Sequence, residues 1–337
     1  MKYRKLGNSG LDVSVVGLGC NNFGMICSLD QTKRVVQKAL NLGINLFDTA
    51  DVYGNRGNSE LYLGKALGKA RKDVLIATKF AVAMGDGPHM RGGSRRYIMQ
   101  AVEDSLKRLG TDYIDLYQMH APDPNTPIDE TLRALDDLIY HGKVRYIGCS
   151  NFRGWQLVEA KWTSEASQLN TFISAQNRYS ILSRDLEIEL VPAAEKLGVS
   201  ILPYFPLESG LLTGKYTHHH KPTKGTRWEV WGKRGPQVTN AFFSDAKFKK
   251  VEKLRALCDK YEHSLLDLAF GWLIGQPTVA SVIAGATKPK QVEQNVNAGN
   301  YSLSFDEIAE VDKITAPQDH LEPYRADPPV RPGAGKL

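Results

Sequence analysis

Four side chains with complementary chemistry are spaced through the first part of the chain. They are Asp48, Tyr53, Lys79 and His120. A tyrosine phenol has a pKa of about 10, and a neighbouring ammonium group lowers that value because it favours the phenolate. A carboxylate keeps the ammonium group charged and in place, and an imidazole can orient a carbonyl oxygen through a hydrogen bond. Together these residue types predict a site that protonates a carbonyl oxygen while hydride is delivered to the carbonyl carbon.

Three short apolar runs must position these side chains. The runs cover residues 44–54, 74–79 and 113–120, and each reads as a β-strand followed by polar residues. Successive parallel strands would bring their polar ends to one edge of a sheet, where α/β barrels keep their active sites. A single such residue at a strand end is more often a cap or a surface group, with about a one-in-ten chance of being catalytic. Their joint occurrence on three consecutive runs favours the site.

These runs resemble the signatures of a known family, the aldo-keto reductases. The resemblance is carried by residues 47–54 (FDTADVYG), 77–79 (ATK) and 112–120 (DYIDLYQMH), and it covers residues 3 to about 315. Among the branches of the family, the chain is similar to the bacterial reductases and to the potassium-channel β-subunits. The resemblance implies NADPH-dependent reduction of aldehydes and ketones to alcohols, with Tyr53 as the general acid of the tetrad.

Strand and helix patterns alternate along the chain, which predicts a single α/β domain. The resemblance implies that this domain is an (α/β)8 TIM barrel. Its expected limits are residues 1–316, followed by a Pro-rich C-terminal tail at 317–337. An N-terminal β-hairpin (residues 3–6 and 11–13) would close the bottom of the barrel. A long loop (208–244) would follow strand 7, and a C-terminal helix (305–314) would end the fold.

Cap residues and apolar periodicity predict where the elements begin. Asp30 is the predicted N-cap of the first barrel helix and Ser94 that of the third, because such side chains accept hydrogen bonds from free helix amides. Ser304 is the predicted start of the last helix. The later strands are expected at residues 144–149, 172–176, 199–203 and 281–284.

The resemblance also implies an extended NADPH (NADP+) that lies across the mouth of the barrel. Ser150, Asn151 and Gln176 would hydrogen-bond the nicotinamide carboxamide, and the ring of Tyr204 would stack on the nicotinamide. An alternative for Ser150 and Asn151 is that they cap the next helix. The other cofactor-binding residues that the resemblance implies are Gly19, Cys20, Asn21, Asp48, Phe205, Pro206, Leu207, Ser209, Gly210, Leu211, Lys215, Arg227, Gly285, Thr287, Lys288, Gln291, Gln294 and Asn295.

The choice between NADPH and NADH depends on the last of these cofactor motifs, residues 285–295. Thr287 and Lys288 stand at the predicted amino end of a helix, which attracts phosphate through its free amides and dipole. Gln291 occupies a position where some relatives carry an Arg that clamps the 2′-phosphate. Arg227 in the long loop could supply a guanidinium instead. The sequence therefore favours NADPH.

The substrate pocket is expected on the loops beside the tetrad. Its predicted lining is Phe23, Tyr53, Phe80, Met84, His120, Trp228 and Trp231. The two tryptophans could instead anchor the long loop. The neighbouring run at residues 218–220 (HHH) is interpreted as solvated loop rather than a metal site, because adjacent histidines cannot all face one ion.

Composition limits the class of protein. Of 337 residues, 42% are hydrophobic and 24% are charged, and the net charge of +6 is spread along the chain, which argues against a nucleic-acid arm. Four cysteines, none at metal-ligand spacing, argue against a disulfide framework and a metal site. No apolar stretch is long enough to span a bilayer. We expect a cytoplasmic monomer or homo-oligomer that binds a small carbonyl compound, and neither a nucleic acid nor a membrane.

Two other functions remain open at this point. The first is a regulatory subunit that senses the redox state of NADP(H), as the potassium-channel β-subunits that the chain resembles do. The second is a metal-dependent barrel hydrolase that uses Asp48 and His120. The hydrolase is disfavoured because no second histidine or carboxylate pair completes a metal site.

Overall fold

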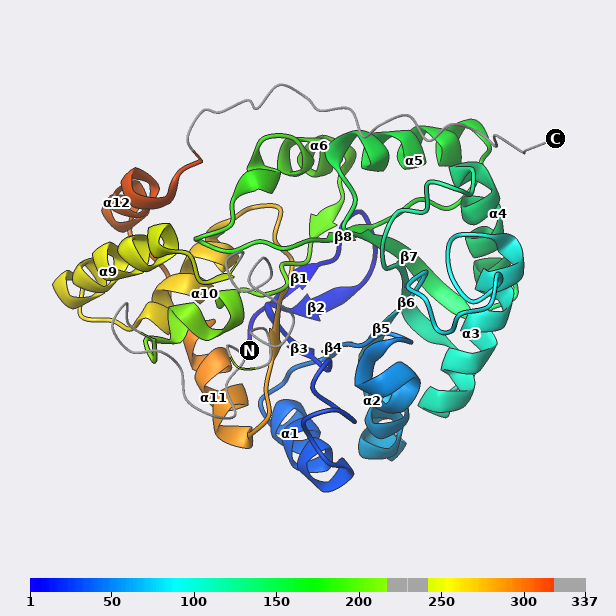
Figure 1. The fold of residues 1–337 in the computed structure, drawn as a ribbon, viewed down its shortest axis with the longest axis horizontal. Helices are drawn as coiled ribbons and strands as arrows, with labels where there is room; N and C mark the ends of the chain where they lie inside the picture. Colours follow the sequence, from blue (N-terminus) through cyan, green and yellow to red (C-terminus); the bar gives the residue numbers. More distant parts are fainter. Residues whose placement is uncertain (217–228, 230–241, 318–337) are drawn as a thin grey trace.

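Eight parallel strands form one curled sheet that is ringed by helices (Figure 1). The fold was obtained as a computed structural model, and the structure describes residues 1–216, 229 and 242–317. The spatial order of the strands is β10-β3-β4-β5-β6-β7-β8-β9. Their bounds are β3 (Val16–Gly19), β4 (Leu46–Asp48), β5 (Leu75–Phe80), β6 (Ile114–Met119), β7 (Val144–Ser150), β8 (Ser174–Gln176), β9 (Ser200–Ile201) and β10 (Val282–Gly285).

Backbone hydrogen bonds close the sheet into a barrel. Ile201 in β9 donates its N–H to the Thr278 carbonyl at 2.8 Å, and Ile283 in β10 donates to the Pro203 carbonyl at 2.9 Å. These bonds join the two edges of the sheet, and the predicted (α/β)8 barrel is confirmed. β8 and β9 are shorter than the predicted runs at 172–176 and 199–203. Pro203 has no N–H to extend the ladder of β9.

Helices follow most strands and cover the outside of the barrel (Figure 1). Each buries an apolar stripe, as α4 does with Leu132, Leu135 and Leu138. The helices are α1 (Leu29–Asn41), α2 (Tyr53–Leu67), α3 (Arg95–Leu109), α4 (Ile128–Tyr140), α5 (Gly154–Ala166), α6 (Leu190–Leu197), α9 (Asp245–Lys260), α10 (Leu265–Gly275), α11 (Pro289–Ala298) and α12 (Phe305–Thr315). Short 3-10 turns are η1 (Gly68–Asp73), η2 (Asp185–Glu187) and η3 (Glu208–Thr213).

The predicted helix caps are right at two positions and wrong at one. Ser94 and Ser304 are the N-caps of α3 and α12. The N-cap of α1 is Ser28, not Asp30, because Ser28 and Gln31 form a reciprocal capping box. Asp30 lies in the first turn of α1, where its charge suits the helix dipole.

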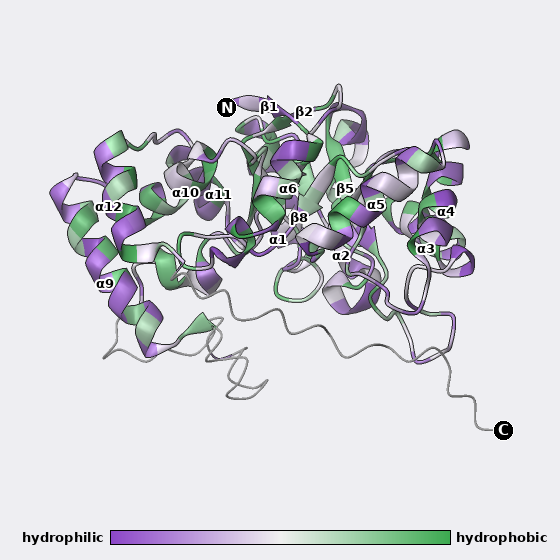
Figure 2. Cartoon of the chain, turned by 90° about the horizontal axis from the view of Figure 1, so that it is seen from above, coloured by the Kyte–Doolittle hydropathy of each residue, from purple (hydrophilic) through white to green (hydrophobic). Residues whose placement is uncertain are grey.

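A two-stranded hairpin closes the lower end of the barrel, as predicted. It consists of β1 (Tyr3–Lys5) and β2 (Asp12–Ser14), and Figure 2 shows it at one end of the molecule, near the N-terminus. The Tyr3 hydroxyl donates to the Gly43 carbonyl ahead of β4, at 2.8 Å. Leu6 and Val13 are fully buried in a cluster with residues from inside the barrel, such as Leu46. A ligand bound at the carboxyl ends of the strands would therefore lie at the opposite end of the barrel from the hairpin.

Two predicted segments fall mostly outside the described residues. They are the long loop after strand 7, through residues 217–228 and 230–241, and the tail from 318 onward. Across the segments that the structure does describe, no helix has the length and apolar character needed to cross a bilayer.

Candidate active site

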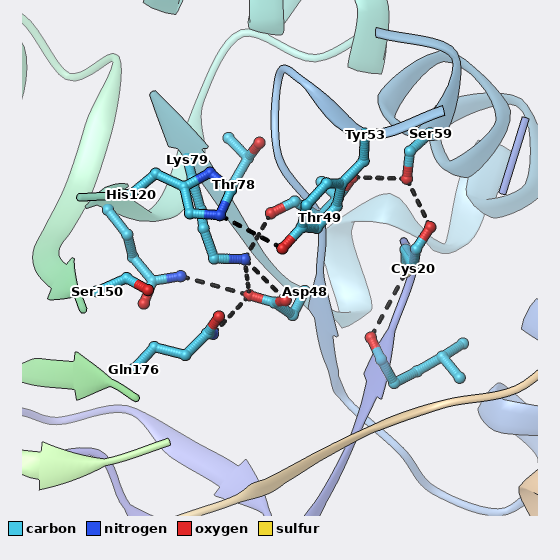
Figure 3. Close-up of polar contacts among 12 residues, drawn as sticks. Cys20, Asp48, Thr49, Tyr53, Ser59, Thr78, Lys79, His120, Ser150 and Gln176 are labelled. Atoms are coloured by element: carbon cyan, nitrogen blue, oxygen red, sulfur yellow. Dashed lines mark hydrogen bonds and ion pairs between the residues drawn. The ribbon is translucent and has the colours of Figure 1, made fainter. Parts of the chain in front are cut away.

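The carboxyl ends of β4, β5 and β6 bring the four predicted side chains together (Figure 3). Asp48 is the last residue of β4, Lys79 lies next to the end of β5, and His120 directly follows β6. Tyr53 begins α2, where residues 54–57 have left-handed φ values from 61° to 114°. A Cβ on Gly54 would lie 2.4 Å from the carbonyl oxygen of Phe23, so the turn that places Tyr53 requires glycine.

Lys79 and Asp48 form a buried ion pair. The Lys79 Nζ lies 2.7 Å and 2.8 Å from the two Asp48 carboxylate oxygens, and it also donates to the Thr49 carbonyl at 2.9 Å. The Lys79 side chain has no exposed area. Burial lowers the pKa of the Lys79 ammonium, but the neighbouring Asp48 carboxylate and Tyr53 together outweigh burial, and the net pKa is raised. Lys79 therefore stays charged at neutral pH.

Tyr53 stands between the ammonium and the imidazole. Its hydroxyl is 3.5 Å from the Nε2 of His120, and the Lys79 Nζ is 5.1 Å from the centre of its ring. Burial raises the pKa of the Tyr53 phenol, Lys79 opposes that rise, and Asp48 adds to it. The sequence-based expectation of a lowered pKa is therefore wrong in its net sign, because burial outweighs the ammonium. The consequence is a phenol that keeps its proton at neutral pH.

His120 is neutral at physiological pH. Burial, together with the positive charge of Lys79, lowers the pKa of the imidazole to about 3. Its Nδ1 is buried and has no hydrogen-bond partner within the described part of the chain, whereas Nε2 faces Tyr53. A neutral ring with one nitrogen turned toward the phenol can orient an oxygen between them without competing for the proton.

Two buried amides complete the surroundings of Asp48. The Nε2 of Gln176 donates to Asp48 Oδ1 at 2.7 Å, and the Nε2 of Gln118 donates to the same oxygen at 3.4 Å. Gln176, predicted to contact the cofactor, thus holds the carboxylate in this structure. Gln118 was missed in the sequence, although it lies two residues before His120, and alternate strand residues share a face.

Ser150, Asn151 and Tyr204 form one hydrogen-bonded group at the mouth. The Tyr204 hydroxyl donates to Asn151 Oδ1 at 2.7 Å. The Asn151 amide nitrogen donates to the His120 carbonyl at 2.9 Å and to Ser150 Oγ at 3.1 Å. The alternative that Ser150 and Asn151 cap the next helix is wrong, because the N-cap of α5 is Arg153.

The first and last cofactor motifs meet across the closed sheet. Gly19 of β3 and Gly285 of β10 are paired in the ladder, and a Cβ on Gly285 would lie 3.4 Å from the Asn21 side-chain oxygen. The adjacent Cys20 thiol is fully buried, and burial raises its pKa well above the ordinary value. Gly19 and Gly285 have little room for a side chain, so a ligand at this edge would contact their backbone atoms.

The amino end of α11 is already capped by its own side chain. Gln291 Oε1 accepts from the Thr287 N–H at 2.8 Å, the Thr287 hydroxyl at 3.1 Å and the Lys288 N–H at 3.2 Å. A 2′-phosphate at this helix end would therefore have to displace the Gln291 amide. Further along α11, Gln294 is exposed and Asn295 is buried.

The loop after β9 has an unusual backbone. Positive φ values occur at Phe205 (53°), Glu208 (44°), Ser209 (57°) and Gly210 (98°). A Cβ on Gly210 would lie 3.0 Å from the Lys215 Nζ, so this lysine folds back over the loop. Within this turn the Glu208 N–H donates to the Phe205 carbonyl at 2.9 Å and the Gly210 N–H to the Leu207 carbonyl at 2.8 Å, so an anion at this turn would meet the Lys215 ammonium. The predicted partners Pro206, Leu207 and Leu211 flank this turn.

The predicted substrate lining is only partly brought to the mouth. Phe23 and Phe80 are fully buried in the hydrophobic core, and Phe80 packs against Tyr117 with ring centres 4.8 Å apart. Met84 is partly buried at the edge of the core. Arg227, Trp228 and Trp231 lie outside the described residues.

A further carboxyl group close to the tetrad was missed in the sequence. Asp51 is 1% exposed, its N–H donates to the Lys79 carbonyl at 3.1 Å, and its Oδ2 accepts from the Tyr97 hydroxyl at 3.2 Å. Its Oδ1 is buried and meets no hydrogen-bond donor in the described part of the chain. Burial and the nearby charge of Glu60 raise the pKa of Asp51 to about 7.

We expect Asp51→Asn to remove a pH-dependent loss of stability. Between pH 4 and 7 the unfolded chain releases the Asp51 proton before the folded chain does, so the wild-type free energy of unfolding falls as pH rises. A pKa of about 7 in place of 3.8 makes the full loss, present above pH 7, about 4 kcal/mol at most. Urea unfolding of both proteins at about pH 4 and 9 measures it. If the difference in free energy of unfolding between Asp51→Asn and the wild type does not grow from about pH 4 to about pH 9, the expectation is contradicted.

Comparison with known proteins places the whole barrel in one family. The aldo/keto reductase family model matches residues 15–316. The chain is 37% identical to the uncharacterized oxidoreductase YrpG of Bacillus subtilis (strain 168), over 90% of this chain and 92% of that one. It is 36% identical to a probable voltage-gated potassium channel subunit beta of Oryza sativa subsp. japonica, over 88% and 91% of the two chains. It is 32% identical to the L-glyceraldehyde 3-phosphate reductase of Escherichia coli (strain K12), over 94% and 93%.

The matches agree with the closed barrel and with the side chains gathered at its mouth. Both the family model and these relatives cover nearly the whole described chain, including the ends of β4, β5 and β6. The chain therefore belongs to the aldo/keto reductase family, and it is an NAD(P)H-dependent oxidoreductase.

Proposed function

We propose that this protein reduces aldehydes and ketones to alcohols with NADPH, and that Tyr53 is the general acid. The observation that carries the proposal is the hydroxyl of Tyr53, which keeps its proton and lies 3.5 Å from a neutral His120 beside the buried Lys79–Asp48 pair. A relative named L-glyceraldehyde 3-phosphate reductase supports an aldehyde as the substrate.

Each residue of the tetrad has one role in this proposal. A bound nicotinamide supplies hydride to the carbonyl carbon. The carbonyl oxygen accepts a hydrogen bond between Tyr53 and His120, and Tyr53 transfers its proton to that oxygen as negative charge develops on it. The positive charge of Lys79 stabilises the phenolate that remains, and Asp48 holds Lys79 in place. Because Lys79 is fully buried, water does not weaken this interaction.

The residues present fit a nicotinamide dinucleotide. Ser150 accepts one hydrogen bond from Asn151, and its own proton remains able to meet a carboxamide oxygen. Tyr204 offers its ring at the mouth, and the turn at Gly210 has the Lys215 ammonium beside it for a diphosphate. The amino end of α11 would receive a phosphate once the Gln291 side chain is displaced. These residues would hold the cofactor, which would supply hydride to the carbonyl compound.

Purified protein tests this proposal directly. NADPH absorbance should fall when 4-nitrobenzaldehyde or methylglyoxal is added, and the alcohol should form in equal amount. The same assay with aldehyde but without protein is the control. Tight NADPH binding without any carbonyl-dependent oxidation would contradict the proposed activity.

On cofactor choice, we expect NADPH to bind at least about tenfold more tightly than NADH. A tenfold difference in affinity corresponds to about 1.4 kcal/mol. One charge-assisted contact between a 2′-phosphate and Lys288 can supply that amount. Titration of tryptophan fluorescence with each cofactor gives both dissociation constants. Lys288→Met should reduce the ratio of the NADH dissociation constant to the NADPH dissociation constant. Lys253→Met, on the exposed face of α9, should leave that ratio unchanged. Equal constants in the wild type would mean that the Gln291 cap excludes the phosphate.

A second candidate function is regulatory. The chain is 36% identical to a protein named a probable potassium channel subunit beta, so a cofactor-loaded barrel that reports NADP(H) redox state to a partner is the competing proposal. Turnover separates the two, because a sensor needs tight cofactor binding but little carbonyl reduction. The cytoplasmic location and the monomeric or homo-oligomeric state remain predictions from the sequence.

A further inference from the structure

A second buried charge cluster lies on the other side of the mouth from the tetrad. At its centre is Glu208, the first residue of η3, whose side chain has no exposed area. The Glu208 carboxylate accepts from Arg178 at 2.5 Å and 3.2 Å, from the Lys247 ammonium at 2.8 Å and from the Ser180 hydroxyl at 2.9 Å. Burial would raise the pKa of this carboxyl, but Arg178 and Lys247 outweigh it and the pKa is lowered. Glu208 is therefore ionised at neutral pH.

This cluster joins three separate parts of the chain. Arg178 and Ser180 follow β8, Glu208 follows β9, and Lys247 lies in the first turns of α9. A backbone hydrogen bond also joins the segments after β8 and β9, since the Tyr204 N–H donates to the Asn177 carbonyl at 3.0 Å. The loop after β9 is thus fixed both by its own strand pairing and by the side chain of Glu208.

The loop that Glu208 fixes is strained. Glu208 and Ser209 hold φ values of 44° and 57°, and such left-handed conformations cost about 1–3 kcal/mol for each non-glycine residue. Residues persist in such conformations only where surrounding contacts determine them. For Glu208, those contacts are the bonds of its carboxylate to Arg178, Lys247 and Ser180. The same turn, with Lys215 folded over Gly210, is the segment that we assign to the cofactor's diphosphate.

A series of edge-on aromatic contacts links the cluster to Tyr204, the residue proposed to contact the nicotinamide. The Arg178 guanidinium lies 4.2 Å from the centre of the Phe242 ring. Phe242 packs edge-on against Phe205 at 5.3 Å, and Phe205 packs edge-on against Tyr204 at 5.2 Å. Tyr204 in turn holds Asn151 through its hydroxyl. Loss of the Glu208 charge would therefore release both the turn and the packing behind Tyr204.

We propose that Glu208 is a positioning residue for cofactor binding, and that its clamp by Arg178, Lys247 and Ser180 holds residues 205–210 in the cofactor-binding conformation. The inference rests on the proposed function, because it needs NADPH as the ligand. Glu208 itself acts through the loop and transfers no proton. Its effect should therefore fall on cofactor affinity rather than on the chemical step.

The test is Glu208→Gln, which keeps the size of the side chain and removes its charge. We expect the NADPH dissociation constant to rise at least about tenfold, while kcat at saturating NADPH stays within about threefold of wild type. Amide hydrogen exchange in the cofactor-free protein should accelerate at residues 205–212. An unchanged dissociation constant, or unchanged exchange at these residues, overturns the proposal.

Glu307→Gln provides a matched control. Glu307 is 4% exposed and accepts hydrogen bonds from Tyr301, the Ser304 N–H and His263, but it lies on α12, far along the chain from the loop. This variant should lose stability in the same way without a change in NADPH affinity. If Glu307→Gln weakens NADPH binding as much as Glu208→Gln does, the Glu208 effect is general destabilisation and the proposal fails.

A milder variant covers the case in which Glu208→Gln does not fold. Lys247→Met removes one cation and leaves the Arg178–Glu208 pair, so the dissociation constant should rise by about threefold; no rise overturns the proposal. Failure of the proposed function has a different signature. In that case the wild type itself would either not bind NADPH or bind it without reducing any carbonyl compound. Here the wild type does both, and only the variants bind NADPH more weakly.

Discussion

Tyr53→Phe is expected to lower kcat/KM for aldehyde reduction by about 100- to 10,000-fold, the usual range for removal of a general acid. Phenylalanine keeps the ring beside His120 and Lys79 and removes only the hydroxyl that lies 3.5 Å from His120 Nε2. NADPH affinity should therefore stay within about twofold. Steady-state kinetics with one aldehyde, together with a fluorescence titration of NADPH, measure both quantities.

Tyr113→Phe is the matched control for this change. Tyr113 immediately precedes β6, at the end of the barrel away from the tetrad, and its ring packs under the guanidinium of Arg71 at 4.2 Å. Its activity should remain within about twofold of wild type. Retention of more than a tenth of wild-type kcat/KM in Tyr53→Phe would show that another group supplies the proton.

Lys79→Met is expected to abolish reduction and to lower the free energy of unfolding by about 3–5 kcal/mol. Removal of one partner leaves the other charge buried without compensation, and buried pairs lose about this much. The Asp48 carboxylate is 5% exposed, so water cannot replace the ammonium. Denaturant unfolding measures the change in stability.

Two variants test the cause of that loss. Adding Asp48→Asn to Lys79→Met removes the orphaned charge, so it should restore part of the stability but none of the activity. Lys5→Met breaks an exposed pair with Asp12, whose partners are 59% and 57% exposed, and should cost less than about 1 kcal/mol. If Lys79→Met cost no more than Lys5→Met, the buried pair would not stabilise the fold.

Local patterns were sufficient to predict a single α/β domain and the meeting of the tetrad, whereas the closed barrel was predicted from the family resemblance. Each strand is an apolar run, and a polar residue at its end needs only the parallel order of strands to reach the mouth. Caps are also local, and the Ser28–Gln31 capping box was readable, although Asp30 is an equally favourable residue type.

The errors concern properties that depend on distant residues. The sign of the Tyr53 pKa shift follows from burial, which no spacing of Asp48 and Lys79 reveals. Gln291 was compared with an arginine of relatives, but its role as the cap of α11 follows from the fold of residues 287–291. Glu208 was missed because Arg178 and Lys247 lie 30 and 39 positions away in the chain.

The hairpin across the lower end has a kinetic consequence. Leu6 and Val13 pack against residues of the barrel interior, so the hairpin blocks access to the tetrad from that end of the barrel. If the proposed function holds, the cofactor and the carbonyl compound would both approach from the carboxyl ends of the strands. We then expect an ordered reaction in which the cofactor binds first and leaves last. A hairpin of two three-residue strands, on the opposite side of the barrel from the tetrad, would thereby contribute to the order of binding.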